Sequence, residues 1–145
     1  MVKEKTDWVA ASQKAAATDK WTETILRVLT KKAAKRWKFV SFRGKRGREW
    51  RGIVDVLAIR KDTAQPKSES LKPGDLFEFI LIQMKGGSAK MPSAEEKDRL
   101  RAVAKYYKAR KIVLFEWKKG EKAQFYFLGK NLQWEETTAT ELFGK

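Results

Sequence analysis

The sequence contains neither cysteine nor histidine among its 145 residues. The absence of cysteine excludes disulfides and thiolate metal sites. The absence of histidine removes the usual general base, the usual zinc ligand and every Ser-His or Cys-His catalytic pair. Any bound metal ion must therefore have oxygen ligands, which favours Mg²⁺ or Mn²⁺ over zinc.

Long apolar segments are missing as well. The start of the chain is charged and lacks the apolar centre of a signal peptide. The longest apolar runs are far shorter than the ~20 residues that span a bilayer. We therefore expect a soluble, intracellular protein without a membrane partner. Its expected location is the cytoplasm, with association to the nucleoid in a bacterial, archaeal or phage setting.

Acidic residues are scarce relative to basic ones. The 33 lysines and arginines outnumber the 18 aspartates and glutamates, which gives a formal net charge of +15. The 42% hydrophobic residues are enough to build one core in a chain of this length. A charge of this size favours polyanionic partners. Nucleic acid is the first candidate. An anionic membrane surface is the second, but no basic helix with a clear apolar face supports it.

The hydrophobic pattern predicts a helix, three strands, a second helix and two strands. The first helix should run from about residue 19 to about residue 35, with Trp21, Ile25, Val28 and Leu29 on its apolar face. The predicted strands span residues 36–43, 49–60, 76–85, 111–117 and 123–129. Residues 61–75, which include two prolines, should form a loop.

The second helix has a clear start signal. Ser93 precedes Glu96 by three residues, which is the pattern of a capping box. A short helix is also expected near 137–143. Residues 1–18 should form an N-terminal arm or helix, and residues 19–145 a single domain. The order of elements indicates an α+β fold, with a small mixed sheet flanked by helices and a crossover from the third strand to a parallel fourth strand.

Two apolar strands carry polar side chains that call for an explanation. In "FEFILIQMKGG", Gln83 and Lys85 share a strand face, because strand side chains alternate. In "RGIVDVLAIR", Asp55 interrupts an apolar run, and a buried carboxylate must be paired, hydrogen-bonded or bound to a metal. If the second and third strands form a hairpin, Asp55 lies beside Gln83 and Lys85.

These three residue types suit the hydrolysis of a phosphodiester. Such a reaction needs a divalent ion that polarises the phosphate and lowers the pKa of a water molecule. Asp55 can hold the ion, with the Gln83 side-chain oxygen as a weaker neutral ligand. Lys85 can orient or deprotonate the water, or neutralise charge that develops on the phosphate. Taken singly, Asp55 can equally pair with Arg43 or Arg51, and Lys85 can be an ordinary strand-end lysine.

The motifs "GIVD" (52–55) and "QMK" (83–85), in this order of elements, resemble the PD-(D/E)XK nuclease superfamily, in particular its restriction-endonuclease-like and Holliday-junction-resolvase-like members. The resemblance covers roughly residues 19–117 and implies an αβββαβ core. It implies a metal-dependent DNA endonuclease, with Mg²⁺ or Mn²⁺ as cofactor and junctions or branched DNA among its substrates. It allows a homodimer, in which two sites cut two strands.

The resemblance assigns metal binding to Asp55 and Gln83 and assistance of the water to Lys85. The sequence departs from the family pattern at Gln83, where an acidic residue is usual. Either Gln83 binds the metal through its oxygen, or a nearby acid replaces it, or the protein is an inactive nucleic-acid-binding relative. Glu95 is the preferred substitute, because Glu96 already has a place in the capping box.

Many members of this family also carry a glutamate on the first helix. Glu23 is the candidate here, as a third metal ligand and catalytic residue, although it lies nearly opposite the predicted apolar face of that helix. Only Leu26 is near it on the helical wheel.

A flexible basic turn follows the first predicted strand and suits contacts with phosphates. The predicted nucleic-acid-binding residues there are Arg43, Lys45, Arg46, Arg48 and Arg51. Gly86 and Gly87 follow Lys85 and would let a nucleic-acid backbone approach closely, or they merely end the strand. DNA is the expected partner.

Overall fold

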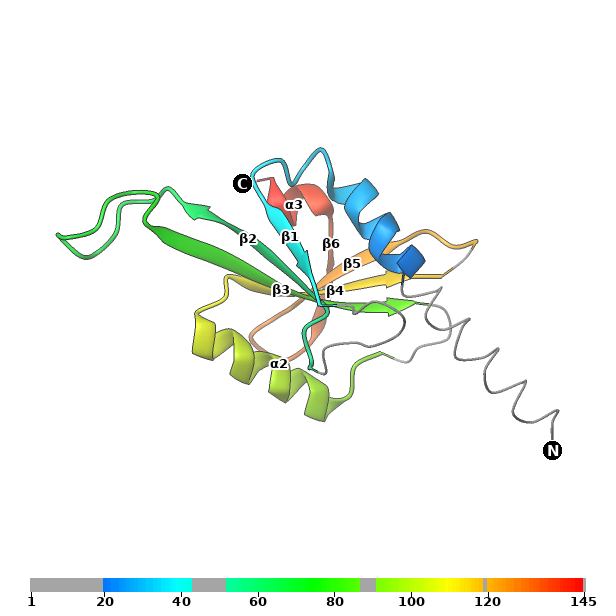
Figure 1. The fold of residues 1–145 in the computed structure, drawn as a ribbon. Helices are drawn as coiled ribbons and strands as arrows, with labels where there is room; N and C mark the ends of the chain where they lie inside the picture. Colours follow the sequence, from blue (N-terminus) through cyan, green and yellow to red (C-terminus); the bar gives the residue numbers. More distant parts are fainter. Residues whose placement is uncertain (1–19, 43–51, 87–90, 119, 145) are drawn as a thin grey trace, which may run out of the picture.

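The computed structural model describes residues 20–42, 52–86, 91–118 and 120–144 (Figure 1). A helix over residues 20–30 leads to the strands β1 (Lys38–Ser41), β2 (Val56–Asp62) and β3 (Leu76–Gly86). The helix α2 (Ala94–Tyr107) follows, then β4 (Lys111–Trp117), β5 (Gln124–Leu128), β6 (Trp134–Thr137) and the short helix α3 (Ala139–Phe143). The predicted N-terminal arm, residues 1–18, lies outside the described residues.

The strands form one mixed sheet in the order β1-β2-β3-β4-β5-β6. Neighbouring strands are antiparallel except β3 and β4, which are parallel and are connected through α2. A parallel pair needs such a crossover, because a short turn can only reverse the chain. The α+β class and the αβββαβ order of the core are therefore confirmed.

The helices cover both faces of the sheet. Figure 1 shows the helix over 20–30 (blue) and α3 (red) on one side and α2 on the other. The main core lies on the first side, where Leu26, Trp37 and Phe143 pack against Val56 and Ile80. The indole Nε1 of Trp37 donates a hydrogen bond to the Phe143 carbonyl oxygen at 3.0 Å, which fixes the end of the chain against the start of β1.

The predicted apolar face of the first helix is wrong. Trp21 and Val28 are 59% and 65% exposed, whereas Thr22, Glu23 and Leu26 are buried. Thr30 is buried on the same helix, and its hydroxyl donates to the Leu26 carbonyl oxygen at 2.7 Å, so the helix backbone satisfies this side chain. The helix also ends at residue 30 rather than near residue 35.

Two strand predictions need smaller corrections. The second strand begins at Val56, so Asp55 stands immediately before it rather than inside it. The strand β6 was not predicted, because its short sequence WEET places two exposed glutamates at its centre and gives no apolar alternation. It joins the sheet through backbone pairing with β5 at one edge. No helix among the described residues is long and apolar enough to cross a membrane.

Candidate active site

Asp55 is held at the start of β2 by backbone and side-chain hydrogen bonds. Its N–H donates to the Ile82 carbonyl oxygen at 3.0 Å, and its own carbonyl oxygen accepts from the Phe42 N–H at 3.0 Å. The pairing of Val56 with Ile82 places Asp55 opposite Gln83. Its carboxylate oxygen Oδ2 accepts from the Met84 N–H at 2.7 Å. The predicted proximity of Asp55 to the end of β3 is therefore observed.

Gln83 is the most enclosed polar group at this end of β3. Its side chain is only 5% exposed, and its amide Nε2 donates to Glu96 Oε2 at 3.2 Å. The amide oxygen Oε1 is buried and has no hydrogen-bond partner among the described residues. Leaving such an atom unsatisfied costs about 1–3 kcal/mol. The arrangement thus presents one unsatisfied oxygen in a buried position opposite Asp55.

Glu96 contacts Gln83 and Lys85, and Glu95 is exposed. The Oε1 atom of Glu96 accepts from the Ser93 N–H at 3.3 Å in the predicted capping box, while Oε2 meets both strand residues. The structure therefore brings Glu96, rather than the predicted Glu95, against Gln83, and the replacement of a metal ligand by either acid stays a prediction. The capping box occupies only the Oε1 atom of Glu96, which leaves Oε2 available for the two strand residues.

The environment of Glu96 favours its ionised form. Partial burial acts to raise the pKa of this carboxyl, but the Ser93 backbone N–H, the positive charge of Lys85 and the Gln83 amide together lower it. The Lys85 Nζ lies 3.6 Å from Glu96 Oε2, and both side chains are partly buried, at 21% and 31% exposure. The ion pair thus holds the Lys85 ammonium on the same strand face as the Gln83 amide.

Of the other predicted site residues, the structure describes only Glu23 and Gly86. Glu23 is 6% exposed on the inner face of the first helix, and its role at the site stays a prediction. Gly86 is the last residue of β3 and pairs with Trp117 of β4. The remaining predicted nucleic-acid contacts lie outside the described residues, namely Arg43, Lys45, Arg46, Arg48, Arg51 and Gly87.

The donor set of the described residues fits a hard divalent ion in part. Asp55 supplies a carboxylate and Gln83 an unsatisfied amide oxygen, and oxygen ligands of both kinds suit Mg²⁺ or Mn²⁺. Among the described residues there is no group of three or more acidic side chains that could hold a metal by themselves. Water and substrate phosphate would complete the coordination, as is usual for Mg²⁺.

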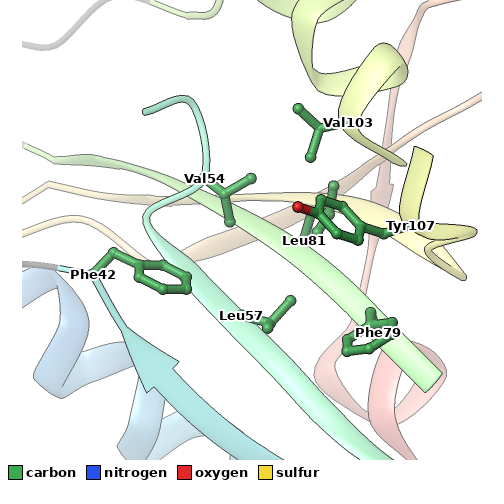
Figure 2. Close-up of a pocket in the computed structure, with 7 residues that line it drawn as sticks. All are labelled: Phe42, Val54, Leu57, Phe79, Leu81, Val103 and Tyr107. Carbon is green, nitrogen blue, oxygen red and sulfur yellow. The ribbon is translucent and has the colours of Figure 1, made fainter. Parts of the chain in front are cut away.

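An apolar hollow lies on the same sheet face as the site. Its volume is about 380 Å³, and the side chains around it come from the ends of β1 and β2, from β3 and from α2 (Figure 2). Val54 precedes Asp55, and Leu81 lies two residues before Gln83 on the same face. Apolar walls next to polar groups lower the local dielectric constant and strengthen their interactions.

Comparison with known proteins gives a structural resemblance but no sequence family. Neither a family model nor a curated protein sequence matches it. A solved structure that resembles it is that of Hjc, a Holliday junction resolvase from the archaeal hyperthermophile Archaeoglobus fulgidus. The TM-score is 0.47 and the identity 15%, over 85% of this chain and 92% of that chain.

Proposed function

We propose that the protein is a metal-dependent nuclease that hydrolyses phosphodiester bonds in DNA, with junctions or branched DNA as its preferred substrates. The observation that supports this most is the buried, unsatisfied Gln83 Oε1 opposite Asp55, with Lys85 two residues further along the same face. An amide oxygen that binds a metal needs an open lone pair, and the Gln83 Oε1 atom has one among the described residues.

Each residue has a separate task in this proposal. Asp55 and Gln83 would hold the divalent ion, with Glu23 as a further ligand from the first helix. When bound, the ion polarises the phosphate and lowers the pKa of a water molecule. Lys85 orients that water or offsets charge on the phosphate. Glu96 is a positioning residue, because it holds the Lys85 ammonium and the Gln83 amide from the side of α2.

Gln83 also supports a second candidate function, nucleic-acid binding without hydrolysis. If the Gln83 substitution has ended hydrolysis, the protein binds nucleic acid without cutting it. The absence of a three-acid group among the described residues favours this alternative. A homodimer, which would bring two sites to two strands, stays a prediction.

A cleavage assay separates the two functions. Labelled duplex, single-stranded and four-way-junction DNA are incubated with Mg²⁺, Mn²⁺ or EDTA. The wild type is compared with Asp55→Asn and Lys85→Ala, and with Glu95→Gln as a matched control, because Glu95 is exposed beside Glu96. We expect metal-dependent cutting that Asp55→Asn and Lys85→Ala abolish and Glu95→Gln retains. Salt-sensitive binding without cutting under any metal would support the inactive alternative.

A further inference from the structure

Basic residues gather at the end of the β2–β3 hairpin that lies away from the candidate site. Two adjoining hollows of about 220 and 640 Å³ share Arg36 and Arg60 in their walls. Lys32 and Lys35 line the smaller hollow, and Lys38 and Lys61 line the larger one. Neither hollow has an acidic residue among the described residues that line it. We call this surface the distal basic surface.

Only one of these cations has a structural partner among the described residues. Arg60 donates to Glu78 Oε2 at 2.6 Å and lies over the Trp37 ring, 4.3 Å from its centroid, so it serves the hairpin and the core. The other five are exposed, and none forms an ion pair with another described residue. Their charges are therefore uncompensated over the part of the chain that the structure describes.

The sheet register brings the basic side chains of separate segments together. Lys38 pairs with Ile59 on β2, and Lys61 lies two residues further along the same face, so the two Cα atoms are about 8 Å apart. This spacing equals about one Debye length at physiological ionic strength, so their fields add. Phe77 stands opposite Lys61, is 53% exposed and contributes an aromatic wall to the larger hollow.

The distal basic surface is separate from the candidate site. Asp55 immediately precedes β2 and Lys61 is the residue before its last, and six residues of extended chain span about 20 Å. Surface charges at that separation are screened from the site. Duplex DNA rises about 3.4 Å per base pair, so a duplex lying along the hairpin would need about six base pairs to connect them.

We infer that the distal basic surface binds backbone phosphates of the nucleic acid at a distance from the bond that is cut. This inference rests on the proposed function and adds a second contact to it. The described residues that line the hollows include exposed lysines and Arg36 on several segments, and the least exposed cation among them, Arg60, is already paired with Glu78. Such a surface suits a polymer with repeated charges, which gains from several weak contacts at once.

The test compares two double variants of equal charge. Lys38→Gln/Lys61→Gln removes two charges from the distal basic surface. Lys105→Gln/Lys130→Gln removes two exposed charges elsewhere. Binding is measured in EDTA, over a series of KCl concentrations, with labelled duplexes of about 8 and about 30 base pairs. A cut bond at the centre of the short duplex leaves only about four base pairs, or about 14 Å, on either side, so this duplex does not reach the distal basic surface while it is being cut. Cleavage of the short duplex with Mg²⁺ is measured in parallel.

We expect Lys38→Gln/Lys61→Gln to weaken binding of the long duplex about fivefold or more and to reduce its salt slope by about 2, since each lost phosphate contact removes about 0.9. Cleavage of the short duplex at its central bond should not change, and the control variant should resemble the wild type. An unchanged salt slope, in a wild type that binds and cuts, would overturn the inference but leave the proposed function standing. A wild type that binds neither duplex would overturn both.

Discussion

The amide nitrogen of Gln83 donates to the carboxylate of Glu96 at 3.2 Å, while the amide oxygen stays buried without a hydrogen-bond partner among the described residues. An acidic residue at position 83 would place a second carboxylate against Glu96, and the two would repel each other. The neutral amide of Gln83 donates a hydrogen bond to Glu96 instead. This contact also links the metal-binding proposal to the helix, because Glu96 holds Lys85 as well.

The substitution Gln83→Glu tests the role of the amide. The new carboxylate would lie against Glu96, lose the amide donor and destabilise the protein by about 1–3 kcal/mol without metal. A divalent ion should offset the repulsion, so Mg²⁺ should raise the Tm of this variant more than that of the wild type. Thermal unfolding in EDTA and in Mg²⁺ measures both effects. If Mg²⁺ raises the Tm of the variant and of the wild type equally, Gln83 does not bind the metal.

The substitution Asp55→Ala separates the structural role of this carboxylate from its chemical role. It leaves the Met84 N–H without its acceptor, so the free energy of unfolding should fall by about 1–3 kcal/mol. Asp55→Asn retains an acceptor oxygen and should be closer to the wild type in stability while losing cleavage. Urea unfolding of both variants checks this difference. Equal destabilisation by Ala and Asn would show that the Met84 hydrogen bond contributes little.

Glu96 should make stability depend on acid pH. Because its pKa is lowered in the folded protein, it binds protons more readily when unfolded. Its contribution is therefore complete above its ordinary value of 4.5 and is lost as the pH falls through the lower folded value. Glu96→Gln should be less stable at neutral pH and lose less stability on acidification. Urea midpoints between neutral and acid pH measure this, with Glu95→Gln as the control. Parallel pH profiles for Glu96→Gln and the wild type would contradict it.

A matched pair of leucines tests the orientation of the first helix. Leu26 is fully buried and Leu29 is 47% exposed. Leu26→Ala should lower the free energy of unfolding by about 2–5 kcal/mol, because it leaves a cavity in the core. Leu29→Ala should change it by about 0.5 kcal/mol or less, as is usual for surface substitutions. Chemical denaturation of both variants measures the contrast. A larger loss of stability for Leu29→Ala than for Leu26→Ala would show that the apolar face predicted from the sequence is the buried one.

Much of the fold could be predicted because it depends on local patterns. The strand β3 matches its predicted bounds within one residue and β4 matches them fully, since both are continuous apolar runs ended by polar or glycine residues. The capping box at Ser93 was also predicted, because a helix start depends on residues only three positions apart. The edge strand β6 was not, because backbone pairing rather than its own side chains places it in the sheet.

The candidate site could be predicted only in part. Alternation along β3 placed Gln83 and Lys85 on one face, and the hairpin brought Asp55 beside them. Nothing in the local sequence showed that Glu96 would reach both, because this depends on how α2 packs on the sheet. The buried face of the first helix depends on packing in the same way. Thr30 can lie on that face because its hydroxyl bonds within the helix, and a hydrophobicity pattern does not show this.

The sequence by itself determined the available chemistry. With no cysteine or histidine, only oxygen ligands and a lysine remain for a phosphate-directed site, and the net charge of +15 favours a polyanionic partner. The tertiary structure decided which groups meet. The contact between Gln83 and Glu96 depends on how α2 packs on the sheet, and the placement of Lys38 near Lys61 depends on the register of β1 and β2. Those arrangements come from contacts between residues distant along the chain, which local periodicity does not encode.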